Sequence, residues 1–197
     1  MKSLIFLILL STVSPLLAYE AKLSEEELAR LRFGEEIMRV EELEGEVFPR
    51  VTLINVIAHS PKQNMDVFSD YENHKNFIPG LVKSKIVNKV GNATDVAFEM
   101  HMPAPISNSE YVTKNTVTQD GANYTLAWEL VKSKQLKATK GMVVFEEFGK
   151  RTLFTYITHI TPDSSFAWAV KSRVVPDVKK NVEVLIKHLE KTAGKSL

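Results

Sequence analysis

The chain has 197 residues, with 25 basic and 24 acidic side chains and a formal net charge of +1. This balance, without a basic stripe or tail, excludes the sustained attraction that binding to nucleic acid or to anionic headgroups requires. The absence of cysteine excludes disulfides, cysteine metal sites and a lipid-modified cysteine anchor.

The first 18 residues predict a secretory signal peptide that is not part of the fold. Lys2 is a minimal basic region, an apolar run covers Leu4–Leu10, and Ala18 offers a small residue at the cleavage point. The segment is shorter than the ~20 residues that span a bilayer, and Pro15 interrupts it. We therefore expect a periplasmic or secreted protein with no stable membrane insertion after cleavage.

The mature chain is expected to begin with one short helix and two strands. Ser24 and Glu27 have the spacing of a capping box, and Gly34 ends the helix. A strand is predicted at 36–43. A second strand at 50–59 is β-branched and apolar on both faces, which predicts that it is well buried.

Residues 60–80 predict two short helices. Ser60 is suited to cap the first, and Pro61 suits its first turn. Asp70 is suited to start the second, and Pro79 with its following glycine stops it. Helices this short are not stable alone in water, so they must lie across an apolar surface.

The next part of the chain alternates as a succession of strands with short turns between most of them, which favours an antiparallel meander. The predicted strands are 82–89, 94–102, 109–119, 123–132, 135–147 and 151–161.

A long helix is predicted at the C-terminus. Asp163, Ser164 or Ser165 is suited to cap it, and Pro176 is expected to kink or restart it. Its spacing gives a single apolar stripe, which must be buried against the sheet. The stripe consists of Val175, Val178, Val182, Leu185 and Leu189.

Several sequence motifs, in this order and spacing, resemble those of the START-like or SRPBCC superfamily, which includes polyketide cyclase, coenzyme Q-binding and lipid-transfer proteins. The motifs are V-F-S-D-Y-E-N-H-K-N-F-I-P-G, P-A-P-I-S, Leu126-Ala-Trp-Glu-Leu130, Gly141 with apolar residues after it, and T-L-F-T-Y ending in Tyr156. Relatives often carry Asp-Arg where this chain has Asn108-Ser109, and often Trp where it has Val143.

The resemblance implies an α+β helix-grip fold over residues 19–197: a curved antiparallel sheet wrapped around the long C-terminal helix, with two short helices after the first long strand. It also implies a hydrophobic cavity between the sheet and that helix, where a solid core is the alternative that periodicity alone favours. Residues 60–80 and 103–108 are then the expected gate.

Alternation along the strands indicates which side chains face inward, and it places His101 in solvent. The expected cavity residues are Phe98, Met100, Met102, Leu126, Trp128, Leu130, Val143, Phe145, Phe154, Tyr156, Val175, Val178 and Val182. The expected gate residues are Phe68, Tyr71, Phe77 and Pro79. The polar candidates for the inward face are Tyr111, Asn115 and Tyr156.

No catalytic or cofactor motif is present. The five histidines lack H-x-x-x-H spacing, no serine lies in a G-x-S-x-G elbow, and no dinucleotide or phosphate loop occurs. We therefore expect no metal and no cofactor. The predicted function is binding of a hydrophobic small molecule or lipid in the cavity. The alternatives are a cyclase- or hydrolase-type enzyme that uses the same cavity, and a protein-interaction module whose cavity is closed.

Overall fold

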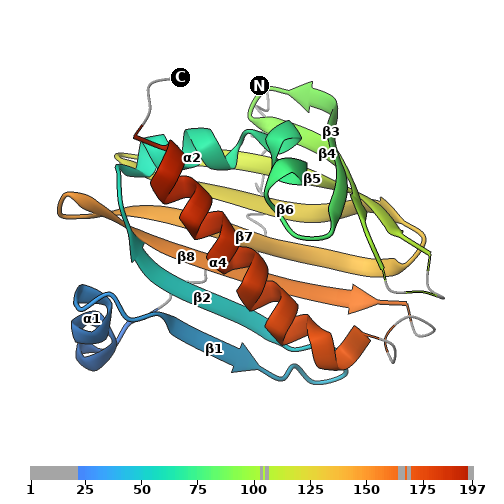
Figure 1. Cartoon of the computed structure of the whole chain (residues 1–197), viewed down its shortest axis with the longest axis horizontal. Coiled ribbons are helices and arrows are strands. Elements are labelled where there is room, and N and C mark those ends of the chain that lie inside the picture. Colours follow the sequence, from blue (N-terminus) through green and yellow to red (C-terminus); the bar gives the residue numbers. More distant parts are fainter. Residues whose placement is uncertain (1–21, 103, 105–106, 164–166, 168–169, 195–197) are drawn as a thin grey trace, which may run out of the picture.

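The structure is a computed structural model in which a long helix lies diagonally across one face of a curved sheet (Figure 1). It describes residues 22–102, 104, 107–163, 167 and 170–194. The predicted signal peptide therefore lies outside the described residues. No helix in the described part combines the length and apolarity needed to cross a bilayer.

The sheet has eight antiparallel strands in the order β1-β2-β8-β7-β6-β5-β4-β3. The strands are β1 (Ile37–Glu41), β2 (Arg50–Ile57), β3 (Leu81–Val90), β4 (Ala93–Met100), β5 (Ser109–Asp120), β6 (Asn123–Ser133), β7 (Leu136–Phe148) and β8 (Arg151–Pro162). The helices are α1 (Glu25–Arg32), α2 (Pro61–Phe68) and α4 (Val174–Thr192), with short 3-10 helices η2 (Tyr71–Asn76) and η3 (Lys171–Arg173). The predicted helix-grip fold and antiparallel meander are confirmed.

Strand β2 is buried on both faces because helices cover it from both sides. Val51 and Leu53 point into the main core under α4, whereas Ile54 and Val56 pack with Leu31 of α1 on the outer face. This double coverage accounts for the absence of hydrophilic alternation in the strand.

Both predicted N-terminal caps of the short helices are present. Ser24 and Glu27 form a capping box on α1, and Ser60 forms one with Gln63 on α2, where Pro61 occupies the first turn. Helix α2 then lies against β6, β7 and α4, and η2 packs on β3. The short helices are thus held by an apolar surface, as expected from their length.

The chain is already helical at Ala167 and Val170, and the long helix α4 follows after the 3-10 turn η3. It starts at Val174, and no side chain caps it, so Asp163 does not cap this helix; Ser164 and Ser165 lie outside the described residues. Pro176 lies in the first turn of α4, where no intrahelical hydrogen bond is lost, and the expected restart of the helix is found at Val174, two residues before it. The buried part of its stripe is formed by Val182, Leu185 and Leu189.

Candidate ligand-binding cavity

The concave face of the sheet is solid at one end. Inward side chains from four strands are almost completely buried there, at 0–1% exposure, and they pack with α2 and with the C-terminal half of α4. These side chains are Val96, Leu126, Val143, Phe145 and Phe154. They form a continuous core, so this end of the sheet has no room for a ligand.

The other end of the same face is hollow. Phe98, Trp128 and Tyr156 are the next inward residues on their strands, and they retain accessible surface although the sheet and α4 enclose them. The space between them is a cavity of about 340 Å³. This volume lies near the lower end of the ~300–1,000 Å³ typical of small-molecule sites.

The cavity walls come from the sheet, α4, η2 and the loops at this end of the molecule. The apolar and aromatic lining residues include Phe48, Ile78, Leu81, Phe98, Met100, Met102, Tyr111, Trp128, Leu136, Tyr156, Ile160, Val170, Val174 and Val178. Apolar walls of this kind supply affinity by removing ligand surface from water.

A row of paired residues across β5 to β8 makes the floor of the cavity. Asn115 pairs with Trp128, Trp128 with Gly141, and Gly141 with Thr158. A Cβ atom at Gly141 would overlap both the Trp128 ring and the Ile157 carbonyl oxygen. The glycine therefore allows the indole ring to lie on β7, with its centroid 5.3 Å from that of Tyr156.

Four buried hydroxyl side chains also line the cavity, and we call them the hydroxyl band: Ser109, Thr113, Thr139 and Thr158. Asn115 lies beside the band and donates hydrogen bonds from Nδ2 to Thr113 Oγ1 at 3.0 Å and to the Thr94 carbonyl at 3.2 Å. Ser109, the first residue of β5, contributes a short neutral side chain to the band.

Two enclosed tyrosines add phenol groups to the cavity. Burial raises the pKa of Tyr156 to about 12, although the neighbouring Thr158 hydroxyl acts in the opposite direction. Burial also raises the pKa of Tyr111, and the proximity of Tyr156 adds to that shift. Both phenols are consequently protonated at neutral pH and are available as hydrogen-bond donors.

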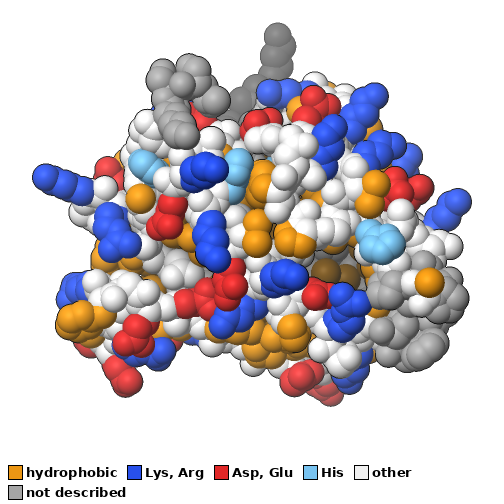
Figure 2. Space-filling model, viewed as in Figure 1, with side chains coloured by type: hydrophobic (Ala, Val, Ile, Leu, Met, Phe, Trp, Pro, Cys, Tyr) orange, Lys and Arg blue, Asp and Glu red, His pale blue; other side chains and the backbone are white. Residues whose placement is uncertain are grey.

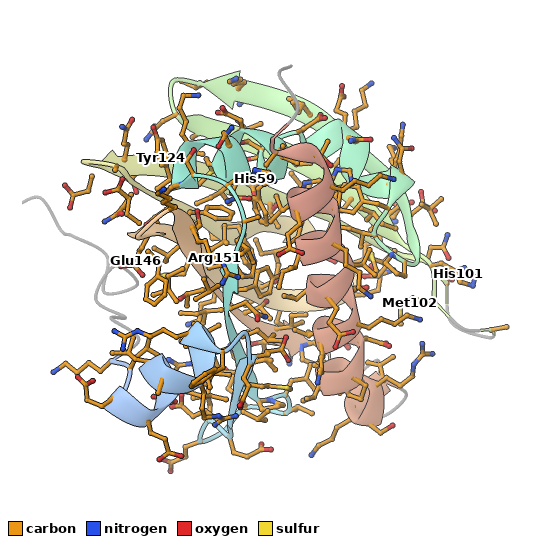
Figure 3. The ribbon with its side chains drawn as sticks, turned by 60° about the vertical axis from the view of Figure 1, so that its left-hand side comes forward. His59, His101, Met102, Tyr124, Glu146 and Arg151 are labelled. Atoms are coloured by element: carbon orange, nitrogen blue, oxygen red, sulfur yellow. The ribbon has the colours of Figure 1, made fainter. Side chains whose placement is uncertain are left out.

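Charged side chains occur only at the mouth among the described lining residues. Arg173 Nε lies 3.4 Å from Asp177 Oδ2, and both side chains are about half exposed. Figure 3 shows His101 and Met102 where the chain leaves β4, on the other side of α4 from Tyr124 and Glu146. On the face that carries α4, basic and acidic side chains are interspersed (Figure 2).

The segment predicted as the gate forms one side of the cavity. Phe68 and Tyr71 line it, together with His74, whose Nε2 lies 2.9 Å from the Phe68 carbonyl oxygen. Phe77 instead stacks on His188 of α4, with ring centroids 3.8 Å apart. Pro79 is partly buried beyond them, and the 103–108 segment lies partly outside the described residues.

The structure divides the predicted cavity residues into two groups. Six line the hollow: Phe98, Met100, Met102, Trp128, Tyr156 and Val178. Five lie in the solid core: Leu126, Val143, Phe145, Phe154 and Val182. The other two are partly exposed: Leu130 pairs with Thr113 on β5, and Val175 packs at the edge of the core.

The hydroxyl band was not predicted from the sequence, although the alternation of side chains along each strand places its threonines on the inward face. Thr113 shares its face with Tyr111, Thr139 with Val143, and Thr158 with Tyr156. His101 is exposed as predicted, but it also lines the mouth, because β4 ends at Met100 and strict alternation ends there as well.

Among the described residues, no group of three or more His, Asp or Glu side chains is placed to hold a metal ion.

No family model and no curated protein matches the sequence. The structure matches a STAR-related lipid transfer protein from Xanthomonas axonopodis with a TM-score of 0.70 and 18% identity, over 78% of this chain and 93% of that one. It matches human STARD10 with a TM-score of 0.68 and 17% identity, over 79% and 69%. A Streptomyces aromatase/cyclase, Zhui, matches with a TM-score of 0.61 and 9% identity, over 72% and 93%.

The protein therefore has the START-like helix-grip fold, and the predicted resemblance to START/SRPBCC proteins is confirmed at the level of the fold. Lipid-transfer proteins and aromatase/cyclases both share this architecture, so the fold by itself does not select one activity. The side chains of the cavity must decide between them.

Proposed function

We propose that this protein is an exported carrier that holds a hydrophobic small molecule or lipid between the concave sheet face and α4. The observation that carries the proposal is the 340 Å³ cavity, which is walled mainly by apolar and aromatic side chains. Burial of apolar ligand surface there contributes roughly 25 cal/mol per Å² before the costs of ordering the ligand. The fold is also that of the Xanthomonas protein described as a STAR-related lipid transfer protein.

The test compares two variants that add similar volume at the hollow and solid ends. Met100→Trp places the new ring in the cavity, whereas Leu126→Trp places it in a core where Leu126 is 1% exposed. Met100→Trp should retain the fold and lose uptake of an uncharged fluorescent probe such as N-phenylnaphthylamine. Leu126→Trp should lower the free energy of unfolding by about 1–3 kcal/mol or more, because overpacking a filled core is costly.

Unchanged probe uptake by a folded Met100→Trp variant would refute the proposed binding site. Native mass spectrometry of protein purified from its own exported fraction provides a second test, because a carrier should retain ligand that can be extracted and identified.

An enzyme of cyclase or hydrolase type is the second candidate, and Tyr111 and Tyr156 favour it most. Their raised pKa values keep both phenols protonated, so they are suited to donate hydrogen bonds to a substrate oxygen and not to act as bases. Under the carrier proposal, Tyr156→Phe should change ligand affinity by about fivefold, the net worth of one hydrogen bond. Turnover of a polyketide or ester that Tyr156→Phe abolishes, with binding retained, would favour the enzyme.

The closed-cavity interaction module is the least favoured of the three alternatives. A cavity of about 340 Å³ is larger than the voids of an ordinary packed core, which seldom exceed the size of a water molecule.

A further inference from the structure

The described lining of the cavity offers little that would neutralise a charged ligand. His101 lies at the exposed mouth, and burial lowers the pKa of His74, which favours its uncharged form. Among the described lining residues, Arg173 and Asp177 are the only Lys, Arg, Asp or Glu side chains. They pair with each other at the mouth, where they remain about half exposed. A carboxylate or phosphate buried beyond them would lose its hydration without gaining an opposite charge, which is strongly unfavourable.

The pKa values of two cavity tyrosines show that the interior disfavours a negative charge. Tyr111 and Tyr156 lie on opposite sides of the cavity floor, on β5 and β8, and burial raises the pKa of each. A raised pKa means that the surroundings favour the neutral phenol over the phenolate. A ligand anion placed between them meets the same surroundings.

The mainly apolar interior nevertheless contains polar groups, because the hydroxyl band and Asn115 bring oxygen atoms to the cavity surface from β5, β7 and β8. Each band residue is at most 7% exposed. Within the described residues, the hydroxyls of Ser109 and Thr139 make no hydrogen bond, and Asn115 uses its amide N–H groups but has no donor on Oδ1. Buried polar groups are normally hydrogen-bonded, so these oxygen atoms are available to form hydrogen bonds with a ligand.

We propose that the cavity selects an uncharged amphipathic ligand, with an apolar body against Phe98 and Met100 and hydroxyl or carbonyl oxygens against the hydroxyl band, and that it rejects carboxylates and phosphates. This inference rests on the proposed function, because it specifies the ligand class of the same cavity. It separates neutral alcohols, esters and ketones from fatty acids and phosphorylated lipids.

The test is competition at pH 8 against bound N-phenylnaphthylamine, an uncharged probe, with laurate, dodecanol, monolauroylglycerol and dodecane. These ligands share one chain length and differ at one end. Dodecanol and monolauroylglycerol should displace the probe at concentrations at least tenfold below those of laurate and below that of dodecane. Equal or stronger displacement by laurate would overturn the inference, while probe binding itself would leave the carrier proposal intact. A protein that binds no probe at all would overturn the carrier proposal as well.

Two matched variants assign the selectivity to the band. Thr158→Val removes one band hydroxyl from β8, and Thr155→Val removes a buried hydroxyl from the opposite face of the same strand. Thr158→Val should weaken dodecanol binding about fivefold and leave dodecane binding unchanged, whereas Thr155→Val should change neither. An equal loss for both ligands in Thr158→Val would show that the threonine acts only in packing, which would overturn the role given to the band.

A third variant supplies the missing charge. Ser109→Lys places an ammonium group in the cavity, and it should lower the concentration of laurate needed for displacement by tenfold or more. If a folded Ser109→Lys variant showed no gain for laurate, the absence of a cation would not be the reason for the selectivity, and the inference would be wrong.

Discussion

Gly141 and Trp128 show how single residues set the shape of the cavity floor. Every inward position of β7 nearer the solid end carries a large side chain, Val143 or Phe145, whereas Gly141 carries none. The missing side chain leaves space that the indole of Trp128 fills from the neighbouring strand. A glycine in the middle of a strand weakens it, so a close approach of another group is the usual reason for its presence.

Gly141→Ala should displace the indole and lower the free energy of unfolding by about 1–3 kcal/mol, because the new methyl group overlaps Trp128 and the Ile157 carbonyl oxygen. Tryptophan emission in a Trp168→Phe background would report the displacement directly. Gly149→Ala is the control: it is strained by its φ of 64° but has open space around it, so it should lower stability without altering the emission. Unchanged emission in both variants would contradict the role given to Gly141.

Helix α4 changes its surroundings along its length. Val178, in its second turn, faces the cavity, whereas Val182, one turn later, is 2% exposed in the solid core. Polar residues Asp177 and Asn181 accompany Val178 at the cavity wall. The same apolar stripe thus contributes Val178 to the cavity wall and Val182 and Leu189 to the core, with Leu185 contacting both.

Carboxylates introduced along α4 should measure this difference. Val182→Asp should cost several kcal/mol of unfolding free energy, because the carboxylate has neither water nor a partner in the core. Val178→Asp should cost distinctly less, because water in the cavity is able to solvate it. Lys180→Asp, on the exposed face, should be nearly neutral. Lys179 is a poorer control, since its ammonium lies 3.5 Å from Glu36 and 3.8 Å from Glu183. Equal losses at positions 178 and 182 in urea unfolding would rule out a hydrated cavity beside α4.

The contact between η2 and α4 contains two histidines joined by an aromatic ring. Phe77 stacks on His188 and makes an edge contact with His74, at centroid distances of 3.8 and 5.6 Å. Burial lowers the pKa of both histidines; Asp70 opposes the shift at each, while His188 adds to it at His74 and Lys191 adds to it at His188. Burial likewise lowers the pKa of His159, which lies near Glu46, Lys140 and Arg50.

These lowered pKa values predict that acid destabilises the protein from near neutral pH. Above about pH 6.5, the unfolded-state pKa of histidine, both states are uncharged and the contribution is constant. As the pH falls below that value, the unfolded chain binds protons that the folded chain does not, so the free energy of unfolding decreases until the pH reaches the folded-state pKa values.

Urea unfolding between pH 7.5 and 5.5 would measure this loss. His188→Phe keeps the stacking on Phe77 and removes a ring whose Nε2 has no partner within the described residues, so it should reduce the pH dependence. His101→Phe alters an exposed ring and should leave the dependence unchanged. An identical pH profile for wild type and His188→Phe would show that the half-buried His188 is not responsible.

At the scale of the whole molecule, one curved sheet performs two tasks on a single face. The end under α2 and the C-terminal half of α4 forms the core that stabilises the fold, and the end near the start of α4 encloses the cavity. On the outer face, Leu31 of α1 packs in a cluster that includes Ile37 of β1, Ile54 and Val56 of β2, and Leu153 of β8. A ligand is therefore expected to stabilise the less densely packed end, while the solid end holds the fold without it.

The chain is also predicted to be processed on export. N-terminal sequencing of the exported protein should give Tyr19 as the first residue, because Ala18 supplies the small residue at the cleavage point. Ala18→Arg should block processing and retain the chain at the membrane, whereas Ala21→Arg should leave it unaffected. Recovery of an intact N-terminus in the wild-type membrane fraction would contradict this prediction.

Local sequence determined the kind and order of the elements and which strand residues face inward. Alternation depends only on backbone geometry, and for this reason Phe98, Trp128 and Tyr156 were placed correctly on the concave face. The caps at Ser24 and Ser60 are equally local, since each hydroxyl bonds an amide three residues away. The length and single apolar stripe of the C-terminal helix predicted its packing on the sheet, and the motifs predicted the START-like fold.

Only the tertiary structure decided where the inward face is solid and where it is hollow. Phe145 and Thr139 lie on the same face of the same strand, yet one is core and the other lines the cavity, because different elements lie opposite them. The start of α4 at Val174 and the contribution of the hydroxyl band were decided in the same way. Periodicity reports the direction in which a side chain points, whereas a cavity depends on whether anything distant in the sequence fills the space in front of it.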